Sequence, residues 1–357
     1  MKLTKTLLAT TVLAFAASVA MAEDLTVVSW GGAYTKSQVE AYHKPWMAET
    51  GNTIISEDYN GGLAEVKSQV EAGNVTWDVV DVELSDAVRG CDEGLLEPID
   101  KSVLPPAPDG TPATEDFIKG ALTECSVATI VWSTIFAYDG DKTKGVKDIN
   151  DFFDLEKFPG KRGMRRSPKA NLEMALMADG VAPDDVYDTL STPEGVDRAF
   201  AKLDTIKDDV VWWEAGAQPP QLLADGEVVM TTAYNGRIFN AAVAEDKPFV
   251  VNWDAQILDF DLWVIPKGAP HKDLALKFIA YSTDTQRLAD QASWISYGPA
   301  RKSSDPLVGL YNDGKTQMAS HMPTSKAAMK KALVNDFEFW ADNQDELNQR
   351  FNSWLVQ

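Results

Sequence analysis

The chain of 357 residues carries 33 lysines and arginines against 54 aspartates and glutamates, a formal net charge of −21 at pH 7. A chain of this length can build about two domains with full-sized hydrophobic cores. Its acidity disfavours nucleic acid and anionic membranes as partners and favours cations in its clefts. Because solubility or adaptation to salt would also explain the acidity, charge alone identifies no ligand.

The N-terminus has the pattern of a cleaved secretory signal peptide over residues 1–22. Lys2 and Lys5 precede an apolar run over 7–17, and the small residues Ala20-Met21-Ala22 form a cleavage site. The apolar run is too short for a membrane span, no lipobox cysteine follows it, and no later segment is apolar for long enough to cross a bilayer. We therefore expect a soluble, exported protein that starts near Glu23.

The first stretch after this segment combines an apolar run with a glycine turn. Thr26-Val27-Val28 has the composition of a buried strand, and Trp30-Gly31-Gly32 then leads through Tyr34 into a segment of helical composition. Such a turn lies at the carboxyl edge of a sheet, where open α/β sheets bind ligands. Trp30 and Tyr34 could offer flat faces to a ligand or fold into the core.

Residues 25 to about 132 alternate between apolar runs and amphipathic segments. Strands that alternate with helices predict βαβ units and a parallel sheet. A loop over 104–115, which holds four prolines, interrupts this unit without ending it. The expected strands cover 26–28, 53–56 and 77–82, the expected helices 63–72 and 84–93, and an extended edge 94–100.

Two cysteines, Cys91 and Cys125, follow the segment expected to be removed. Their spacing fits neither a zinc site nor a redox motif, and a lone pair in an oxidising compartment usually forms one disulfide. We expect a structural disulfide within one domain, with two buried thiols as the alternative.

Two long extended segments, 126–138 and 258–266, are expected to cross between two domains. Between them a second α/β unit is predicted, and the C-terminal tail over 326–355 is predicted to be helical and amphipathic. The expected helices of this part cover 148–153, 172–179, 195–206, 221–225 and 274–282, the expected strands 210–213 and 228–234, and the expected turns 234–237 and 296–301.

The sequence offers little support for an enzyme. Its three histidines, His43, His271 and His321, lie at no metal-ligand spacing, and no nucleophile elbow, phosphate loop or dinucleotide fingerprint occurs. We therefore expect no catalytic residue, no bound metal and no cofactor.

A binding cleft between two lobes fits the pattern better. Asp259 and Asp261 alternate along one strand and so point to the same face, and Glu83 ends another strand. Two buried carboxylates repel each other unless a cation or proton lies between them, and aromatic faces attract cations. Solvated positions are the alternative for each acid. The expected aromatic contacts are Trp30, Tyr34 and Tyr234, with Trp213, Trp263 and Tyr297 as further candidates.

An ordered set of motifs along nearly the whole exported chain resembles one known family, the spermidine/putrescine-binding group of periplasmic substrate-binding proteins of ABC transporters. The motifs are Ser29-Trp30 with Tyr34, Trp77-Asp78-Val79-Val80, Glu93-Gly94-Leu95-Leu96-Glu97-Pro98-Ile99-Asp100, Asp225-Gly226-Glu227, Tyr234-Asn235-Gly236-Arg237 and Asp261-Leu262-Trp263-Val264-Ile265-Pro266-Lys267.

The resemblance implies an α/β, two-lobed periplasmic-binding-protein fold of type II, in which each lobe is a mixed sheet flanked by helices and crossing strands form the hinge. It also implies a receptor without catalytic activity that delivers a ligand to a membrane permease. By analogy Trp30, with Tyr34 beside it, stacks on the polyamine chain, Tyr234 adds a second aromatic, and Asp261 anchors an amine. The family usually has a small or hydroxylated residue where this chain has Glu83.

The chain departs from the family where the second-lobe acids are expected. Glu173 is the candidate acid in this region, but Arg165 and Arg166 precede it. Arginines at a strand edge suit a carboxylate better than an amine, unless they are surface charges. An amino acid or another zwitterionic amine, held in part by Arg165, Arg166 or Arg237, is therefore an alternative ligand.

The sequence thus predicts a monomeric periplasmic receptor of an ABC importer for a small organic cation, most simply putrescine or spermidine. The alternatives are a receptor for an amino acid and, in another class, an exported enzyme on the same scaffold. The expected parts are lobe 1 over 23–135 and 255–315, lobe 2 over 136–254, and C-terminal helices over 316–357 that pack on the lobes.

Overall fold

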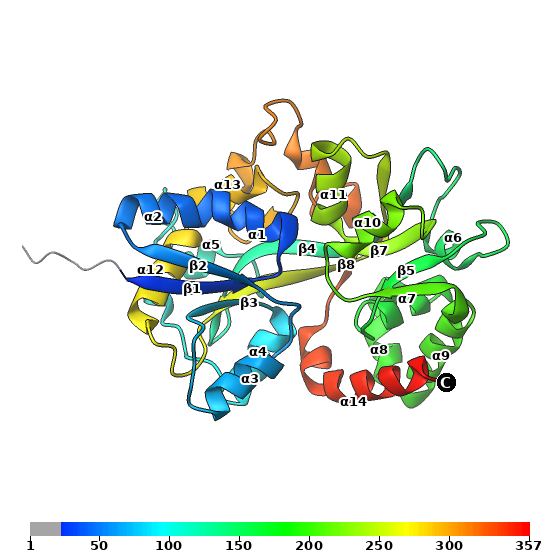
Figure 1. Cartoon of the computed structure of the whole chain (residues 1–357), viewed down its shortest axis with the longest axis horizontal. Helices are drawn as coiled ribbons and strands as arrows, with labels where there is room; N and C mark the ends of the chain where they lie inside the picture. The colour runs from blue at the N-terminus through cyan, green and yellow to red at the C-terminus, as the bar shows by residue number, and fades with distance from the viewer. Residues whose placement is uncertain (1–22) are drawn as a thin grey trace, which may run out of the picture.

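The computed structural model describes residues 23–357, so the predicted signal peptide lies outside the described residues. The elements form two groups joined by two long strands (Figure 1). One ten-stranded mixed sheet runs through both groups in the order β2-β1-β3-β8-β4-β7-β5-β6, and β10 and β9 pair with β8 and β4. The predicted α/β architecture, a mixed sheet flanked by helices, is confirmed. Within the described residues no helix is long and apolar enough to span a membrane.

The first group, here called lobe 1, contains the parallel strands β1, β2 and β3 and the helices around them. It includes two helices that follow β8 in the sequence, and its core joins residues from both parts of the chain. Its elements are β1 (Asp24–Ser29), α1 (Gly32–Gln38), a π-helical turn (Val39–His43), α2 (Lys44–Thr50), β2 (Thr53–Asp58), α3 (Ala64–Glu71), β3 (Val79–Glu83), α4 (Leu84–Asp92), α5 (Ala113–Asp116), α12 (Lys272–Ser282) and α13 (Thr285–Ala292).

The second group, here called lobe 2, is built around the parallel strands β5, β6 and β7. Its main core contains α7, α9 and the C-terminal helix α14, which packs there through Trp340, Phe351 and Trp354. Its elements are α6 (Ile149–Phe153), β5 (Arg162–Arg165), α7 (Asn171–Ala178), α8 (Val186–Leu190), α9 (Pro193–Asp204), β6 (Val210–Trp213), α10 (Gln218–Ala224), β7 (Met230–Tyr234), α11 (Asn235–Ala244) and α14 (Phe337–Leu355).

Two strands, β4 (Ser126–Asp139) and β8 (Phe249–Val264), cross between the lobes as an antiparallel pair. The start of β4 pairs with the end of β8 beside β3, and the end of β4 pairs with the start of β8 beside β7. The pairing register shifts between Ala128 and Ile130 and again between Thr134 and Phe136. Such irregularities bend and twist a strand. They lie in the part of the pair that passes from lobe 1 to lobe 2.

Short elements complete the region near the crossing. β9 (Gly298–Pro299) pairs with β4, and β10 (Leu333–Val334) runs parallel to β8. Short 3-10 turns lie at Lys101–Val103, Pro183–Asp185, Lys207–Asp209, Asp305–Leu307, Met318–His321 and Ala328–Lys331. The predicted boundaries of the lobes remain a proposal, consistent with the two crossing strands.

The predicted disulfide is present between Cys91 and Cys125, with an S–S distance of 1.98 Å. It joins the end of α4 to the residue before β4, within lobe 1. The predicted tail helix is wrong over 326–336, since α14 begins only at Phe337 and the preceding residues form a 3-10 turn and β10. The turn predicted after Tyr234 is the first turn of α11. The sequence analysis did not predict α13.

Candidate functional site

Four acids share one face of the sheet where β3 meets β8. Glu83 pairs directly with Asp261 across the antiparallel strands. Asp81 lies two residues before Glu83 and Asp259 two residues before Asp261, so alternation brings all four side chains to the same face. All four are buried, with exposed fractions of 5% or less. Because like charges in a buried site repel, this face requires cations or protons.

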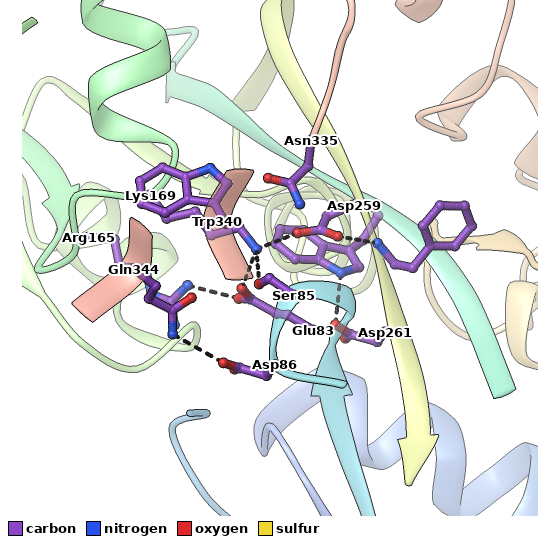
Figure 2. A network of polar contacts seen from close by, with 12 residues as sticks. Glu83, Ser85, Asp86, Arg165, Lys169, Asp259, Asp261, Asn335, Trp340 and Gln344 are labelled. Carbon is purple, nitrogen blue, oxygen red and sulfur yellow. Dashed lines mark hydrogen bonds and ion pairs between the residues drawn. The ribbon is translucent and has the colours of Figure 1, made fainter. Parts of the chain in front are cut away.

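Lobe 2 supplies two of those cations (Figure 2). The Lys169 Nζ lies 2.8 Å from Glu83 Oε2 and 2.7 Å from Asp259 Oδ2, and it donates a hydrogen bond of 3.2 Å to Ser85 Oγ. The Arg165 guanidinium donates to the other Glu83 oxygen at 3.0 Å. Glu83 therefore has a cation on each oxygen, and Lys169 bridges two carboxylates.

The pKa shifts follow these contacts. Burial would raise the pKa of Glu83, but the charges of Lys169 and Arg165 outweigh it and hold the pKa at about 2. Burial would likewise lower the pKa of Lys169, but Asp259 and Glu83 raise it above its ordinary value. Glu83 and Lys169 are therefore both ionised at neutral pH, whereas burial raises the pKa of Asp259.

Unlike Glu83 and Asp259, Asp261 forms no ion pair with a lysine, arginine or histidine within residues 23–357, and the same is true of Asp81. Its Oδ1 accepts a hydrogen bond of 2.8 Å from Trp132 Nε1. Burial, with the nearby charges of Asp81, Glu83 and Asp259, raises the pKa of Asp261 well above its ordinary value. A cation placed against Asp261 would relieve this cost.

Asp81 is fully buried, lies opposite Trp263 across the strands and lines neither pocket described here. Its Oδ2 accepts hydrogen bonds from Gln38 Nε2 at 2.6 Å and Ser29 Oγ at 3.2 Å. Burial raises the pKa of Asp81 to about 7. These contacts make Asp81 part of the support beneath the site.

Aromatic rings surround Asp261. Tyr34 and Tyr297 meet edge to face at 5.4 Å between ring centroids, and Trp132 meets Tyr234 in the same way at 4.9 Å. These residues line part of a partly open pocket of about 250 Å³. It is lined by Trp30, Tyr34, Glu83, Trp132, Tyr234, Arg237, Asp261 and Tyr297.

The position of Trp30 depends on a glycine. Gly61 has φ +85°, and a Cβ at this position would lie 2.2 Å from the Trp30 ring. The ring therefore packs directly on the backbone between β2 and α3, and it meets Tyr59 at 5.3 Å between centroids. Any larger residue at Gly61 would displace Trp30.

A second pocket of about 370 Å³ continues from the first and shares Glu83, Trp132 and Tyr234 with it. Buried polar atoms at its wall, Trp213 Nε1 and Thr232 Oγ1, have no hydrogen-bond partner among the described residues. The wall consists of Glu83, Trp132, Thr134, Arg165, Lys169, Ala170, Asn171, Trp213, Thr232, Tyr234, Ile257 and Asp259. Indole and hydroxyl donors beside two cations form an environment that suits a ligand acceptor.

Arg237 joins the lobes at the first pocket. Its guanidinium donates to the carbonyl oxygens of Gly31 at 2.5 Å and Trp30 at 3.0 Å, while Nε has no partner among the described residues. Arg166, by contrast, forms an exposed ion pair with Glu214 at 3.2 Å and lies in the wall of a wider outer opening.

Most of the predicted site residues are brought together. The first pocket contains Trp30, Tyr34, Glu83, Tyr234, Arg237, Asp261 and Tyr297, and the second contains Asp259 and Trp213. Two predicted residues lie elsewhere. Trp263 is fully buried in lobe 1 against Phe278, two residues along β8 from Asp261. Glu173 is buried beneath α14, where Trp340 Nε1 donates to it at 2.7 Å.

The sequence analysis missed Trp132 and Lys169. Trp132 lies on β4 opposite Asp259, and the length of this predicted crossing strand was a signal that some of its side chains would reach a cleft. Lys169 follows the Arg165-Arg166 pair and precedes α7. Its partners lie 86 and 90 positions away in the sequence, so no local pattern indicates the contact.

Two lobes joined by crossing strands, with aromatic and charged residues lining pockets at their junction, are the architecture of a binding protein for small solutes. The family model "Bacterial extracellular solute-binding protein" matches residues 41–324. The chain therefore belongs to the bacterial extracellular solute-binding family.

Two relatives and one solved structure are similar to this chain over most of its length. The "Gamma-aminobutyric acid-binding protein" of Pseudomonas aeruginosa is 46% identical over 347 residues, covering 97% of this chain and 95% of the relative. The "Putrescine-binding periplasmic protein PotF" of Escherichia coli is 24% identical and covers 80% of each chain. The solved "Structure of Atu4243-GABA receptor" superposes with a TM-score of 0.78 at 34% identity, covering 93% of this chain and 97% of that one. The two-lobed periplasmic-binding fold implied by the resemblance is confirmed.

Proposed function

We propose that this protein is the periplasmic receptor of an ABC importer for a small amino acid whose ammonium and carboxylate lie apart, of the γ-aminobutyrate type. The observation that carries the proposal is the composition of the cleft. Among the acids that line the two pockets, Asp261 has no cation partner within the described residues, and cations and unpaired hydrogen-bond donors lie near it. The relative named for γ-aminobutyrate supports the same ligand class.

The ammonium of the ligand would bind at Asp261. This carboxylate is buried, has a raised pKa and is surrounded by Tyr34, Trp132 and Tyr297. An ammonium gains a charge-assisted hydrogen bond from the acid and cation–π attraction from the rings. It would also remove the cost of burying an unneutralised acid.

The carboxylate of the ligand would bind toward the second pocket or Arg237. Arg165 uses one of its terminal nitrogens for Glu83, so further donors of its guanidinium are available. Trp213 Nε1, Thr232 Oγ1 and Arg237 Nε need acceptors. Buried donors without partners are costly, and a carboxylate would satisfy several of them at once.

A polyamine fits this composition poorly, and the polyamine ligand predicted from the sequence is not supported. Putrescine and spermidine carry several ammonium groups and no acceptor, whereas Arg165 and Lys169 already neutralise Glu83 and Asp259. The putrescine-binding relative is also much less similar than the γ-aminobutyrate-binding one. The amino-acid alternative left open by the sequence is therefore the better hypothesis.

Binding without catalysis is part of the proposal. The cleft pairs acids with cations and aromatic rings, and its wall contains no serine, cysteine or histidine within the described residues that could serve as a nucleophile–base pair. The predicted signal peptide and the extracellular family support a periplasmic location and delivery to a permease.

A thermal-shift screen of ligand-stripped protein tests the proposal. A ligand that binds only the folded state raises the melting temperature by mass action. We expect a large shift with γ-aminobutyrate or a close ω-amino acid and little shift with putrescine or spermidine. Asp261→Asn should strongly reduce the shift, and Arg166→Ala, which removes the exposed ion pair with Glu214, should retain it. A shift confined to polyamines would overturn the ligand class.

A further inference from the structure

We propose that Lys169 is a specificity-determining residue whose ammonium occupies the position that the second ammonium of a diamine would need. The inference rests on the proposed function, because it explains how the cleft selects a ligand with a single ammonium. The inference is based on the polar contacts of Lys169 that Figure 2 shows.

The Lys169 Nζ is placed as a bound ammonium would be. It lies between Glu83 and Asp259, at 2.8 Å and 2.7 Å, and reaches Ser85 Oγ at 3.2 Å. Its three contacts match the three donors of an ammonium group. The contacted groups lie on β3, on β8 and in the first turn of α4, whereas Lys169 itself precedes α7 of lobe 2.

The backbone around Lys169 is held in place. The Asn171 side chain donates hydrogen bonds of 2.7 Å to the carbonyl oxygens of both Arg165 and Ser167. Ala170 has φ +69°, a left-handed conformation that alanine rarely adopts. A strained residue beside a buried cation indicates that the surrounding structure fixes the position of that cation.

Lys169 limits how many ligand ammonium groups the acid face can accept. Glu83, Asp259 and Asp261 would attract two or more cations if Lys169 were absent. With Lys169 present, Glu83 and Asp259 are neutralised from within the protein, and Asp261 remains for the ligand. A diamine would place its second ammonium beside Lys169 or Arg165, where like charges repel.

The test compares γ-aminobutyrate with putrescine, which also has four carbons but ends in an aminomethyl cation where γ-aminobutyrate has its carboxylate. Calorimetry is first done on the wild-type protein, and γ-aminobutyrate binding there establishes the proposed function separately. Lys169→Ala then removes the internal ammonium and leaves two acids beside an open space. We expect Lys169→Ala to bind putrescine at least tenfold more tightly than the wild type, and γ-aminobutyrate more weakly.

Two matched variants test whether the acids freed by removing Lys169 cause the gain in putrescine affinity. Lys169→Ala combined with Asp259→Asn opens the same space with one acid fewer, so most of the gain for putrescine should disappear. Lys169→Arg retains a cation, so it should retain the rejection of putrescine. Ethylammonium should raise the melting temperature of Lys169→Ala but not that of the wild type, because it can replace the missing ammonium.

The possible outcomes distinguish a failure of this inference from a failure of the proposed function. If the wild type binds γ-aminobutyrate and folded Lys169→Ala gains no affinity for putrescine, the inference is wrong while the proposed function stands. If Lys169→Ala does not fold, Lys169→Ser, whose hydroxyl can donate to one carboxylate, replaces it. Failure of both variants to fold even with ethylammonium would show a purely structural role and would also contradict the inference.

Discussion

Asp261 is the residue whose ionisation should respond most directly to the ligand. Its pKa is raised in the free protein, chiefly by burial. A bound ammonium stabilises the ionised form, so binding lowers this pKa and releases protons. Affinity should therefore fall as the pH decreases through the pKa of Asp261 in the free protein.

Calorimetry of γ-aminobutyrate binding in buffers of different ionisation enthalpy measures this release. We expect up to one proton released per ligand in the pH range where Asp261 is partly protonated, and none in Asp261→Asn at a ligand concentration that still permits binding. Equal heats in all buffers at every pH at which the protein stays folded would show that no acid changes its ionisation at the site.

Trp263 provides the contrasting case, because it lies two residues from Asp261 but belongs to the core. Trp263→Ala should lower the free energy of unfolding by about 3–5 kcal/mol, the usual cost of truncating a large buried side chain. The ratio of affinities for γ-aminobutyrate and its homologues should stay the same. Chemical denaturation measures the free energy of unfolding, and calorimetry measures the affinities. An altered ligand preference would show that Trp263 contributes to the ligand site.

At this scale the sequence correctly predicted that Asp259 and Asp261 share one face, because strand alternation places them there whatever the rest of the fold does. It named Arg165 as a candidate partner of a ligand carboxylate but not of Glu83, and it did not predict Lys169. Lys169 reaches Glu83 only through the relative position of two lobes, which no local pattern encodes. The sequence therefore indicated a charged cleft but overestimated the number of acids left for the ligand.

Among the elements, α14 connects the lobes at the outer side of the cleft. It belongs to the core of lobe 2, but its Asp345 accepts two hydrogen bonds of 2.8 Å from the Arg89 guanidinium on α4. Gln344 donates to the buried Asp86 at 3.1 Å, and burial raises the pKa of Asp86 to about 6. These contacts favour the arrangement in which the lobes meet.

The Arg89–Asp345 pair is partly exposed, so its effect on closure should be small. Exposed pairs contribute about 0.2–1 kcal/mol, and we expect a double-mutant cycle with Arg89→Ala and Asp345→Ala to give a coupling in ligand affinity within this range. Calorimetry with the four proteins measures it. A coupling of several kcal/mol would mean that α14 controls closure far more strongly than its exposure indicates.

The disulfide also connects two elements, because it joins the end of α4 to the residue before β4. In the chain-entropy model, closing 34 positions contributes about 4 kcal/mol. Replacing both cysteines by serine should lower the free energy of unfolding by about this amount and leave ligand affinity nearly unchanged. Denaturation under oxidising conditions measures the loss, and an equal loss of affinity would show that α4 shifts in the closed cleft.

The elements also show which sequence patterns are reliable. The crossing strand β4 was predicted over 126–138 and forms Ser126–Asp139, because a long apolar β-branched run has few alternatives. The tail was predicted as helix from 326, yet Leu333–Val334 pairs with β8. The pairing of this segment with β8 in the folded protein outweighs its helical composition. The local sequence does not indicate that pairing.

At the scale of the molecule, the structure has the lobes in contact across the acid face. Glu83 of lobe 1 meets Arg165 and Lys169 of lobe 2, and Arg237 of lobe 2 donates to the turn after β1. In hinge proteins a ligand closes the lobes only as far as it binds the closed state more tightly. A ligand that brings one ammonium and one carboxylate adds contacts to both sides of this cleft.

The most direct test of this account is calorimetric titration of the stripped wild-type protein with γ-aminobutyrate, butylamine and butyrate. Each monofunctional analogue keeps the four-carbon chain and removes one charge. We predict that γ-aminobutyrate binds at least a hundredfold more tightly than either analogue, because Asp261 and the donors of the opposite wall both need a partner. Butylamine binding as tightly as γ-aminobutyrate would show that the cleft recognises only an amine and would contradict the account.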